Sequence, residues 1–242
     1  MWDGPLASGM AFGRVRRTVL VLLGVVGAAL TACSGGGAGG GTPLPDATTL
    51  LRNAAAEMRT VQTAHFTITT EGTVAGISLR GAEGTLTRAG DVQGTAQLDQ
   101  AEIEFIIVGD TAYIKGPTGR YQRLPVSLTR AVYDPSAILD PERGVPKLLT
   151  AGRDARTEAR EDVGGQPAYR VRATFDQQAL GPLLPGVTGQ VTGTLWIGAD
   201  RPRVLRARFE VPAATGGTTG APGVVTVTLS DYDRPTTIRP PS

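Results

Sequence analysis

Short stretches in which apolar and polar residues alternate dominate the chain from residue 63 onward. In EIEFIIV, residues 102–108, Ile103, Phe105 and Ile107 are expected opposite Glu102 and Glu104, because a period of two places such side chains on one face of a strand. In RVLRARFEV, residues 203–211, the same pattern predicts an inward face of Leu205, Ala207, Phe209 and Val211. Ten stretches separated by turn residues predict an antiparallel meander. They are AHFTITTEGTV, ISLRGAEGTLT, DVQGTAQL, EIEFIIVGD, TAYIKG, RDARTEAREDV, QPAYRVRATF, GQVTGTLWIGAD, RVLRARFEV and GVVTVTLSDY.

Helical patterns flank and interrupt this meander. Residues 46–62 predict an amphipathic helix with Asp46 as N-cap. Asp134-Pro135 and Asp140-Pro141 each place proline directly after an N-cap residue, so short helices are expected there, and DQQALGPLLPG predicts another. A sheet with one apolar face must cover it, and the helices are the only available cover. The sequence therefore predicts a single α+β domain.

The first part of the chain is typical of a bacterial lipoprotein signal peptide. Arg14, Arg16 and Arg17 form a positive region, and an apolar run, residues 18–30, follows it. The run is shorter than the roughly 20 residues that span a bilayer, but it suits the core of a signal peptide. Leu-Thr-Ala-Cys, ending at Cys33, looks like a lipobox: its small residues admit the peptidase, and its thiol receives diacylglycerol.

Cys33, the only cysteine, is predicted to carry diacylglycerol and palmitate after residues 1–32 are removed. An uncleaved anchor helix is the alternative, but the order of charge, apolar run and small residues favours cleavage; translation from Met10 gives a more usual signal peptide. Residues 33–45 predict a flexible tether that spans roughly 20 Å. Several acyl chains on one cysteine make attachment effectively permanent. We therefore expect the domain, residues 46–242, at the outer face of the cytoplasmic membrane, in the cell envelope.

The composition argues against catalysis and nucleic-acid binding. The chain has one histidine and no nucleophile elbow, P-loop, dinucleotide fingerprint or metal-ligand spacing, so we expect no enzyme, no cofactor and no metal. It holds 24 Lys and Arg against 22 Asp and Glu; residues 1–32 contain three Arg and one Asp, which leaves 21 of each sign afterwards. A chain without net charge lacks the electrostatic attraction on which nucleic-acid binding depends.

His65, Glu102 and Glu104 are the remaining candidates for proton transfer. His65 is expected on the polar side of a strand beside Thr67, and the two glutamates share the charged side of theirs. A solvated surface is the favoured interpretation for all three.

Several strand positions that are due to face the core hold very small residues: Gly94, Ala96, Gly193 and Ala207. Glycines let a sheet bend sharply, and a bent sheet with small residues inside leaves room for an apolar void. Empty apolar cavities are costly, at roughly 24 cal/mol per Å³, so a void is expected where a ligand fills it. Close packing of helices on the sheet explains the same residues, and the pattern alone does not decide between the two.

Segments distributed over the whole chain resemble the LppX/LprAFG family of actinobacterial lipoproteins, most closely its LprG type. The segments that carry the resemblance are PLPDATTLL, TAHFTI, GISLRG, VYDPSAILDPERGVPKLL, GGQPAYRVR, LWI and the closing VTLSDY…RPPS. The hairpin at residues 97–102 is shorter than the family suggests, and PAATGGTTGAPG is longer.

The resemblance implies a half-open antiparallel β-barrel whose helices pack on the concave face around a hydrophobic cavity. It favours a ligand-filled void, and it places a family residue that reaches into the cavity at Val92 or Ala96. The cavity lining is expected to comprise Val92, Ala96, Leu98, Phe105, Ile107, Leu195, Phe209, Leu51, Ala54 and Met58. The mouth is expected at Tyr133, Pro135, Ile138 and Leu139.

The same resemblance implies a carrier of acylated lipids and glycolipids, such as phosphatidylinositol mannosides, across the cell envelope, with a membrane transporter as an expected partner. Two alternatives remain open. One is an accessory or sensor lipoprotein that modulates an envelope transporter, and the other is a structural surface lipoprotein without bound lipid.

Overall fold

The computed structural model describes residues 1, 43–74, 79–130, 134–185, 187–212 and 222–241, with backbone alone at 129 and 130. One compact unit spans Thr42–Ser242, and every helix and strand below belongs to it. The predicted signal peptide, Cys33, most of the tether, Tyr133 and most of PAATGGTTGAPG lie outside the described residues.

Two antiparallel meanders form one sheet of eleven strands, in the order β6-β5-β4-β3-β2-β1-β11-β10-β9-β8-β7. The first meander consists of β1 (Thr63–Glu71), β2 (Leu79–Thr87), β3 (Val92–Leu98), β4 (Glu102–Val108), β5 (Thr111–Lys115) and β6 (Tyr121–Pro125). The second consists of β7 (Arg153–Val163), β8 (Gln166–Phe175), β9 (Val191–Gly198), β10 (Val204–Val211) and β11 (Gly223–Ser230). The first and last strands pair in the middle, with Phe66 opposite Leu229.

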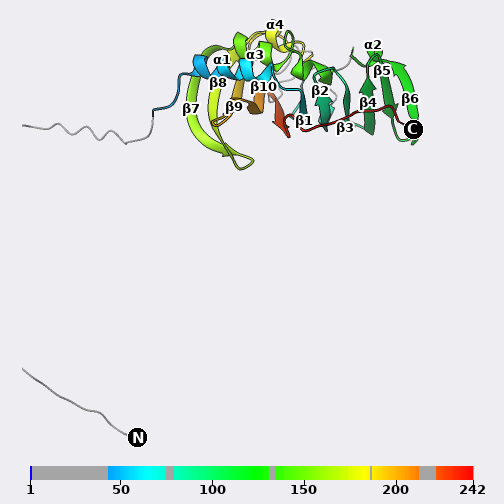
Figure 1. Ribbon diagram of the computed structural model, residues 1–242, viewed down its shortest axis with the longest axis horizontal. Coiled ribbons are helices and arrows are strands. Elements are labelled where there is room, and N and C mark those ends of the chain that lie inside the picture. The colour runs from blue at the N-terminus through cyan, green and yellow to red at the C-terminus, as the bar shows by residue number, and fades with distance from the viewer. Residues whose placement is uncertain (2–42, 75–78, 131–133, 186, 213–221, 242) are drawn as a thin grey trace, which may run out of the picture. The chain divides into compact units, whose positions relative to one another are not determined.

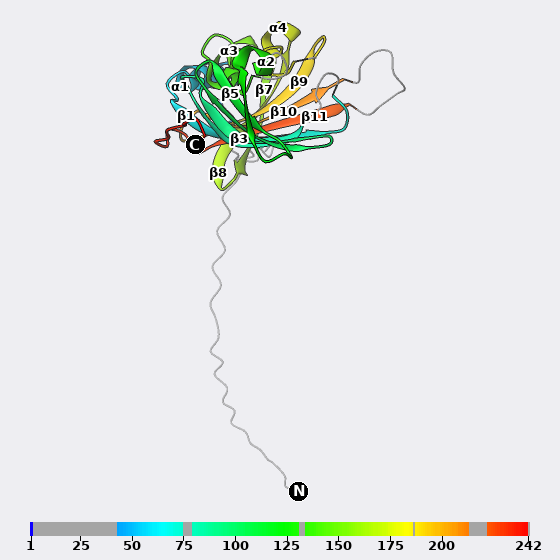
Figure 2. The same ribbon diagram turned by 90° about the vertical axis from the view of Figure 1, so that its right-hand side faces the viewer.

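The sheet is strongly curved and does not close, because β6 and β7 are its two edges and do not pair. Helices cover its concave face (Figures 1 and 2). They are α1 (Ala47–Met58), α2 (Val126–Arg130), the 3₁₀ helix η1 (Pro135–Leu139), α3 (Val145–Ala151) and α4 (Gln177–Leu180). The expected fold class, a half-open antiparallel barrel with helices inside its curve, is confirmed.

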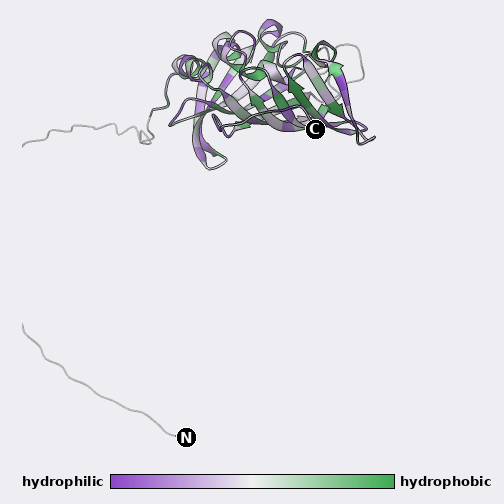
Figure 3. Ribbon diagram, turned by 45° about the vertical axis from the view of Figure 1, so that its right-hand side comes forward, coloured by the Kyte–Doolittle hydropathy of each residue, from purple (hydrophilic) through white to green (hydrophobic). Residues whose placement is uncertain are grey.

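The core lies between this inner face and the helices. Along α1, Leu51, Ala54, Ala55 and Met58 are buried, and Asp46 caps the helix by accepting a hydrogen bond from the Thr49 N–H. Hydrophobic and hydrophilic residues are interspersed along the strands (Figure 3), and in β9 buried residues alternate with partly exposed ones from Val191 to Ile197. The predicted alternation therefore positions the core correctly.

Two predictions about local structure are wrong. Asp140-Pro141 does not start a helix: the Asp140 carboxylate accepts hydrogen bonds from the N–H groups of Glu142 and Arg143 in a turn, and α3 begins only after Gly144. That position needs glycine, because a Cβ there would lie 2.1 Å from the Ala137 carbonyl oxygen. The last strand of the first meander, β6, carries no clear alternation, and the sequence did not predict it.

The predicted inward orientation of Leu205 is also corrected by the structure. A β-bulge between Val204 and Arg206 shifts the register against β9. As a result, Val204 faces the helices, and Leu205 joins a small separate cluster with Val163 and Ala168. Bulges re-aim side chains in this way, and a strict period of two cannot anticipate them.

Candidate functional site

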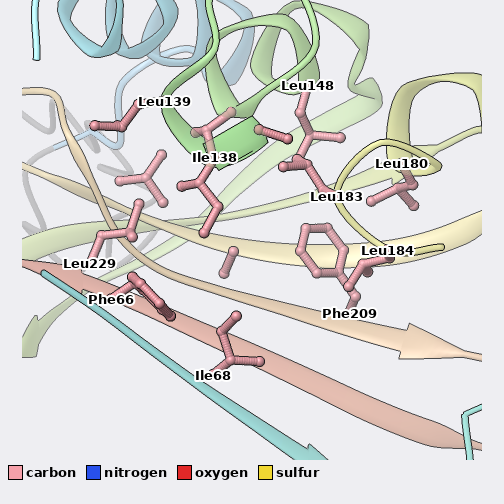
Figure 4. Close-up of a cluster of buried hydrophobic side chains, with 14 of the residues drawn as sticks. Phe66, Ile68, Ile138, Leu139, Leu148, Leu180, Leu183, Leu184, Phe209 and Leu229 are labelled. Carbon is pink, nitrogen blue, oxygen red and sulfur yellow. The ribbon is translucent and has the colours of Figure 1, made fainter. Parts of the chain in front are cut away.

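An apolar pocket lies between the helices and the middle of the second meander. Only hydrophobic side chains line it: Ile138, Val145, Leu148, Leu149, Leu183, Leu184, Leu195, Val204, Ala207, Phe209, Val227 and Leu229. Figure 4 shows Ile138, Leu148 and Leu183 descending from the helical side toward Phe209 and Leu229 on the strands. Such a wall offers dispersion and hydrophobic contacts but no directional polar contact, so it suits a hydrocarbon chain.

The pocket is nearly closed in this conformation. Its volume is about 30 Å³, which is room for a couple of water molecules. Known ligand pockets measure roughly 300–1,000 Å³. An acyl chain therefore enters only if part of the surrounding layer moves.

Hydrogen bonding shows which part of the layer is held least firmly. We call η1 and α3, residues 135–151, the roof of the pocket. Its hydrogen bonds run within this segment, such as Gly144 N–H to Asp140 and Leu148 N–H to Gly144, or to the adjoining Asp134, which caps η1. Within the described part of the chain, no hydrogen bond joins the roof to a strand. Hydrophobic contact alone holds the roof against the sheet.

Helix α1, in contrast, is fixed to the sheet by polar contacts at both ends. Before its first turn, the Thr157 hydroxyl of β7 donates to the Pro45 carbonyl at 2.7 Å. In its last turn, Glu57 accepts from the Arg203 guanidinium at 3.0 Å. Arg203 also pairs with Asp233 at 2.6 Å, and its guanidinium lies 5.1 Å from the centre of the Tyr232 ring. We call Glu57, Arg203, Tyr232 and Asp233 the clasp.

Burial and charge set the protonation of the clasp. Burial raises the pKa of Tyr232, whose hydroxyl donates to the Val204 carbonyl. Burial also acts to raise the pKa of Asp233, but the Gln62 N–H and the Arg203 guanidinium outweigh it, so that this pKa is lowered. Asp233 is therefore ionised at neutral pH, and the clasp keeps α1 in place.

The structure spreads the residues predicted to line a cavity over two regions. Leu195 and Phe209 line the pocket. The other predicted residues belong to α1 or to the first meander: Leu51, Ala54, Met58, Val92, Ala96, Phe105 and Ile107 are buried without lining it, and Leu98 is half-buried. Of the predicted mouth residues, Pro135, Ile138 and Leu139 are buried, and Ile138 lines the pocket itself.

The sequence analysis did not predict much of the pocket wall, because many of its residues lie on the helices that cover the sheet rather than on the strands. Leu148 and Leu149 are paired buried leucines on the short helix α3, and such a pair is a usable signal for a pocket wall. Leu183 and Leu184 lie between prolines, a pattern that gives no periodicity. Val204 enters through the bulge and has no signal in the sequence.

The inner face of the first meander is covered more sparsely. Phe105 and Ile107 are buried, but the apolar side chains around them remain half-exposed: Leu79, Ala82, Leu98, Ile103 and Ile114. At its centre, Gly84 and Gly94 lie directly opposite one another, and a Cβ on Gly94 would lie 2.1 Å from the Glu83 carbonyl oxygen. The glycine pair lets β2 and β3 approach and bend. This region extends the pocket with apolar surface that has no complete cover.

The polar candidates of the sequence lie on the outer face of the sheet. Glu104 pairs with Lys115 at 2.8 Å and accepts from the Tyr121 hydroxyl at 2.9 Å. The Lys115 hydrogen bond lowers the pKa of Glu104, and Glu102 is exposed. Their interpretation as surface residues is confirmed. In the described ranges, no group of three or more His, Cys, Asp or Glu could hold a metal ion.

A curved, unclosed antiparallel sheet with helices inside its curve is the fold of two solved lipoproteins. LprF from Mycobacterium bovis aligns with a TM-score of 0.70 at 23% identity, covering 84% of this chain and 100% of LprF. LppX from Mycobacterium tuberculosis aligns with a TM-score of 0.61 at 17% identity, covering 79% and 97%.

The chain belongs to the LppX_LprAFG lipoprotein family, whose model matches residues 46–238. It is 31% identical over 238 residues to the lipoarabinomannan carrier protein LprG of Mycolicibacterium smegmatis, covering 93% of this chain and 96% of the relative. The protein of the same name from Mycobacterium tuberculosis is 28% identical over 189 residues, covering 75% and 79%. The resemblance to the family is confirmed, and the relatives are named as carriers, in line with the expectation that the chain is not an enzyme.

Among the helices of the described part of the chain, none is long and apolar enough to cross a membrane.

Proposed function

We propose that this protein is a membrane-attached lipoprotein that binds acylated lipids or glycolipids with its inner apolar surface and carries them through the cell envelope. The observation that carries the proposal is the pocket wall of twelve hydrophobic side chains, which continues into half-exposed apolar residues of the first meander. The relatives are named lipoarabinomannan carrier proteins, which supports a lipid or glycolipid cargo.

Loading requires the pocket to enlarge, and the roof is the part that we expect to move. Because hydrophobic contacts alone hold it, an acyl chain that enters replaces side-chain contacts with similar contacts of its own. Each CH₂ that leaves water contributes about 0.8 kcal/mol, which offsets the separation of the roof from the strands. Helix α1 stays in place because the clasp ties it to the sheet.

The polar headgroup is proposed to remain at the rim, near Pro135 and the turn at Asp140. Selectivity then rests on the headgroup, because a smooth apolar wall discriminates only weakly between chains. Attachment is proposed at Cys33, with residues 1–32 as signal peptide, residues 33–45 as tether and residues 46–242 as the lipid-binding domain. A membrane transporter is proposed as partner for handing over the lipid.

Organic extraction of the purified domain, followed by mass spectrometry, tests lipid binding. Ala207→Trp fills the pocket and Ala96→Trp fills the sparsely covered region, while Thr192→Trp places the same ring on the outer face as a control. We expect about one lipid per parent or control protein, and a loss of most of it in Ala207→Trp. Parent protein without stoichiometric lipid contradicts the proposal.

A second candidate is a structural lipoprotein with a packed core, which the small pocket volume of about 30 Å³ favours. The extraction experiment separates the two, since a packed core yields no lipid. A third candidate, a sensor that modulates an envelope transporter, is separated by expressing Ala207→Trp in cells. If lipid content falls while the distribution of envelope lipids stays normal, carriage is not the function.

A further inference from the structure

The outer face of the second meander carries arginines that no carboxylate neutralises. Arg156 of β7 and Arg172 of β8 are directly opposite partners in the sheet, and both are exposed. Neither side chain has an ion-pair or hydrogen-bond partner within the described part of the chain. Like charges directly opposite each other destabilise a sheet. This pair therefore lowers the stability of the fold, and no contact of the two side chains compensates for the repulsion.

The same row continues across the sheet. Arg172 lies opposite Thr194, and Thr194 lies opposite Arg208. With strands about 4.8 Å apart, Arg172 and Arg208 are about 10 Å apart. In the next row, the Arg206 guanidinium lies over the face of the Trp196 ring, 5.6 Å from the ring centre. Arg208 pairs with Glu210, and Arg170 with Glu158 and Glu161.

The outer face of the first meander carries charges of both signs. Glu83, Glu102 and Arg123 are exposed there, and Glu104 is balanced by Lys115. A local row of arginines on the second meander is therefore the feature that can orient the molecule in front of an anionic partner.

The N-terminal segment joins the domain beside this arginine surface. Thr157, next to Arg156, donates its hydroxyl to the Pro45 carbonyl, so the chain leaves the domain at the edge strand β7. A tether of roughly a dozen residues that starts there and ends in a membrane keeps the surface within roughly 20 Å of the lipid headgroups.

We propose that Arg156, Arg172 and Arg206 form a docking surface for the anionic phospholipid headgroups of the membrane to which the chain is attached. The arginines meet lipid phosphates, for which the guanidinium is well suited because of its paired N–H donors. Docking turns the outer face of the second meander to the membrane and leaves the roof pointing away from it. The proposal rests on the membrane attachment in the proposed function and is independent of the cargo.

Vesicle flotation of the domain, residues 42–242, tests the docking surface; this stretch forms one compact unit with a complete core. The probes are vesicles of pure phosphatidylcholine and vesicles with about one third phosphatidylglycerol. We expect binding to the anionic vesicles alone, weakened by salt. Since each arginine near an anionic surface contributes about a fivefold change in affinity, the triple variant Arg156→Gln, Arg172→Gln, Arg206→Gln is expected to bind at least about tenfold more weakly.

The matched control removes three exposed arginines elsewhere: Arg59→Gln, Arg120→Gln, Arg123→Gln. It has the same net charge and is expected to bind like the parent. Equal losses in both triple variants, equal binding of the parent to neutral vesicles, or no binding of the parent at all each overturn the proposal. Lipid extraction of the same samples distinguishes docking from cargo uptake, because the docking variants are expected to keep their lipid.

Discussion

The two meanders use the same strand pattern but differ in how their inner faces are covered. In the second meander, Val171, Phe175, Leu195 and Ile197 are almost completely buried beneath α1, α3 and α4. In the first, η1 contacts β2, and residues such as Ile103 and Ile114 remain half-exposed. The difference teaches that, within one sheet, the well-buried core that stabilises the fold and the incompletely covered apolar surface lie in different meanders.

Glycine has a different role in each meander. Gly94 in the first lets two backbones approach, since a Cβ would collide with the Glu83 carbonyl oxygen. Gly193 in the second leaves room for two rings, because a Cβ would lie 2.7 Å from Phe175 and 2.9 Å from Phe209. The sequence marked both as small inward positions, but only the first concerns the path of the backbone.

The largest expected effect compares the buried side chains of the two meanders. Phe175→Ala removes a fully buried ring that packs edge-on against Phe209, with ring centroids 5.9 Å apart, and is expected to cost about 3–5 kcal/mol of unfolding free energy. Ile103→Ala in the first meander is expected to cost about 1–2 kcal/mol, because that side chain is only partly buried. Urea unfolding measures both, and equal costs would show that the meanders are equally packed.

The next effect sharpens the contrast between the glycines. Gly94→Ala is expected to cost about 2–3 kcal/mol, since a backbone carbonyl cannot move aside as a side chain can. Gly193→Ala is expected to cost about 1–2 kcal/mol, because the two rings can shift. Gly116→Ala is the control: a Cβ there meets nothing within 4 Å, so its unfolding free energy should be unchanged or slightly raised. If Gly94→Ala is as harmless as Gly116→Ala, the close approach of β2 and β3 is not needed.

The smallest expected effect concerns the clasp. The folded-state pKa of Asp233 is lowered, so the stability that its ionised form contributes is present above about pH 4, the unfolded-state value, and is lost as pH falls through the folded pKa. Asp233→Asn is expected to cost less than about 1 kcal/mol at pH 7, because the carboxylate is partly solvated. In urea unfolding, the difference between the parent and the variant should shrink as the pH falls and vanish below the folded-state pKa of Asp233. A difference that persists there would mean that the side chain acts through packing rather than charge.

The predictable features of this protein are those that depend on local pattern. Alternation gave the inner faces of β4 and β8, and an aspartate before an apolar period gave the start of α1. Position 140 has an equally good helix-start pattern, but its carboxylate caps a turn instead, which depends on the close packing of Gly144. The pocket could be predicted only as a region, because its wall combines a bulge at Val204 with leucines from short helices whose positions depend on tertiary contacts.

An unclosed sheet has a further consequence for capacity. A closed barrel fixes its circumference through strand number and stagger, so its interior expands only if backbone hydrogen bonds break. Here β6 and β7 are two unpaired edge strands. The curvature of the sheet between them can increase or decrease through small changes of twist while all backbone hydrogen bonds between strands stay intact. For a carrier of the kind proposed, an unclosed sheet would let the internal space change with the bulk of the cargo without breaking any strand pair.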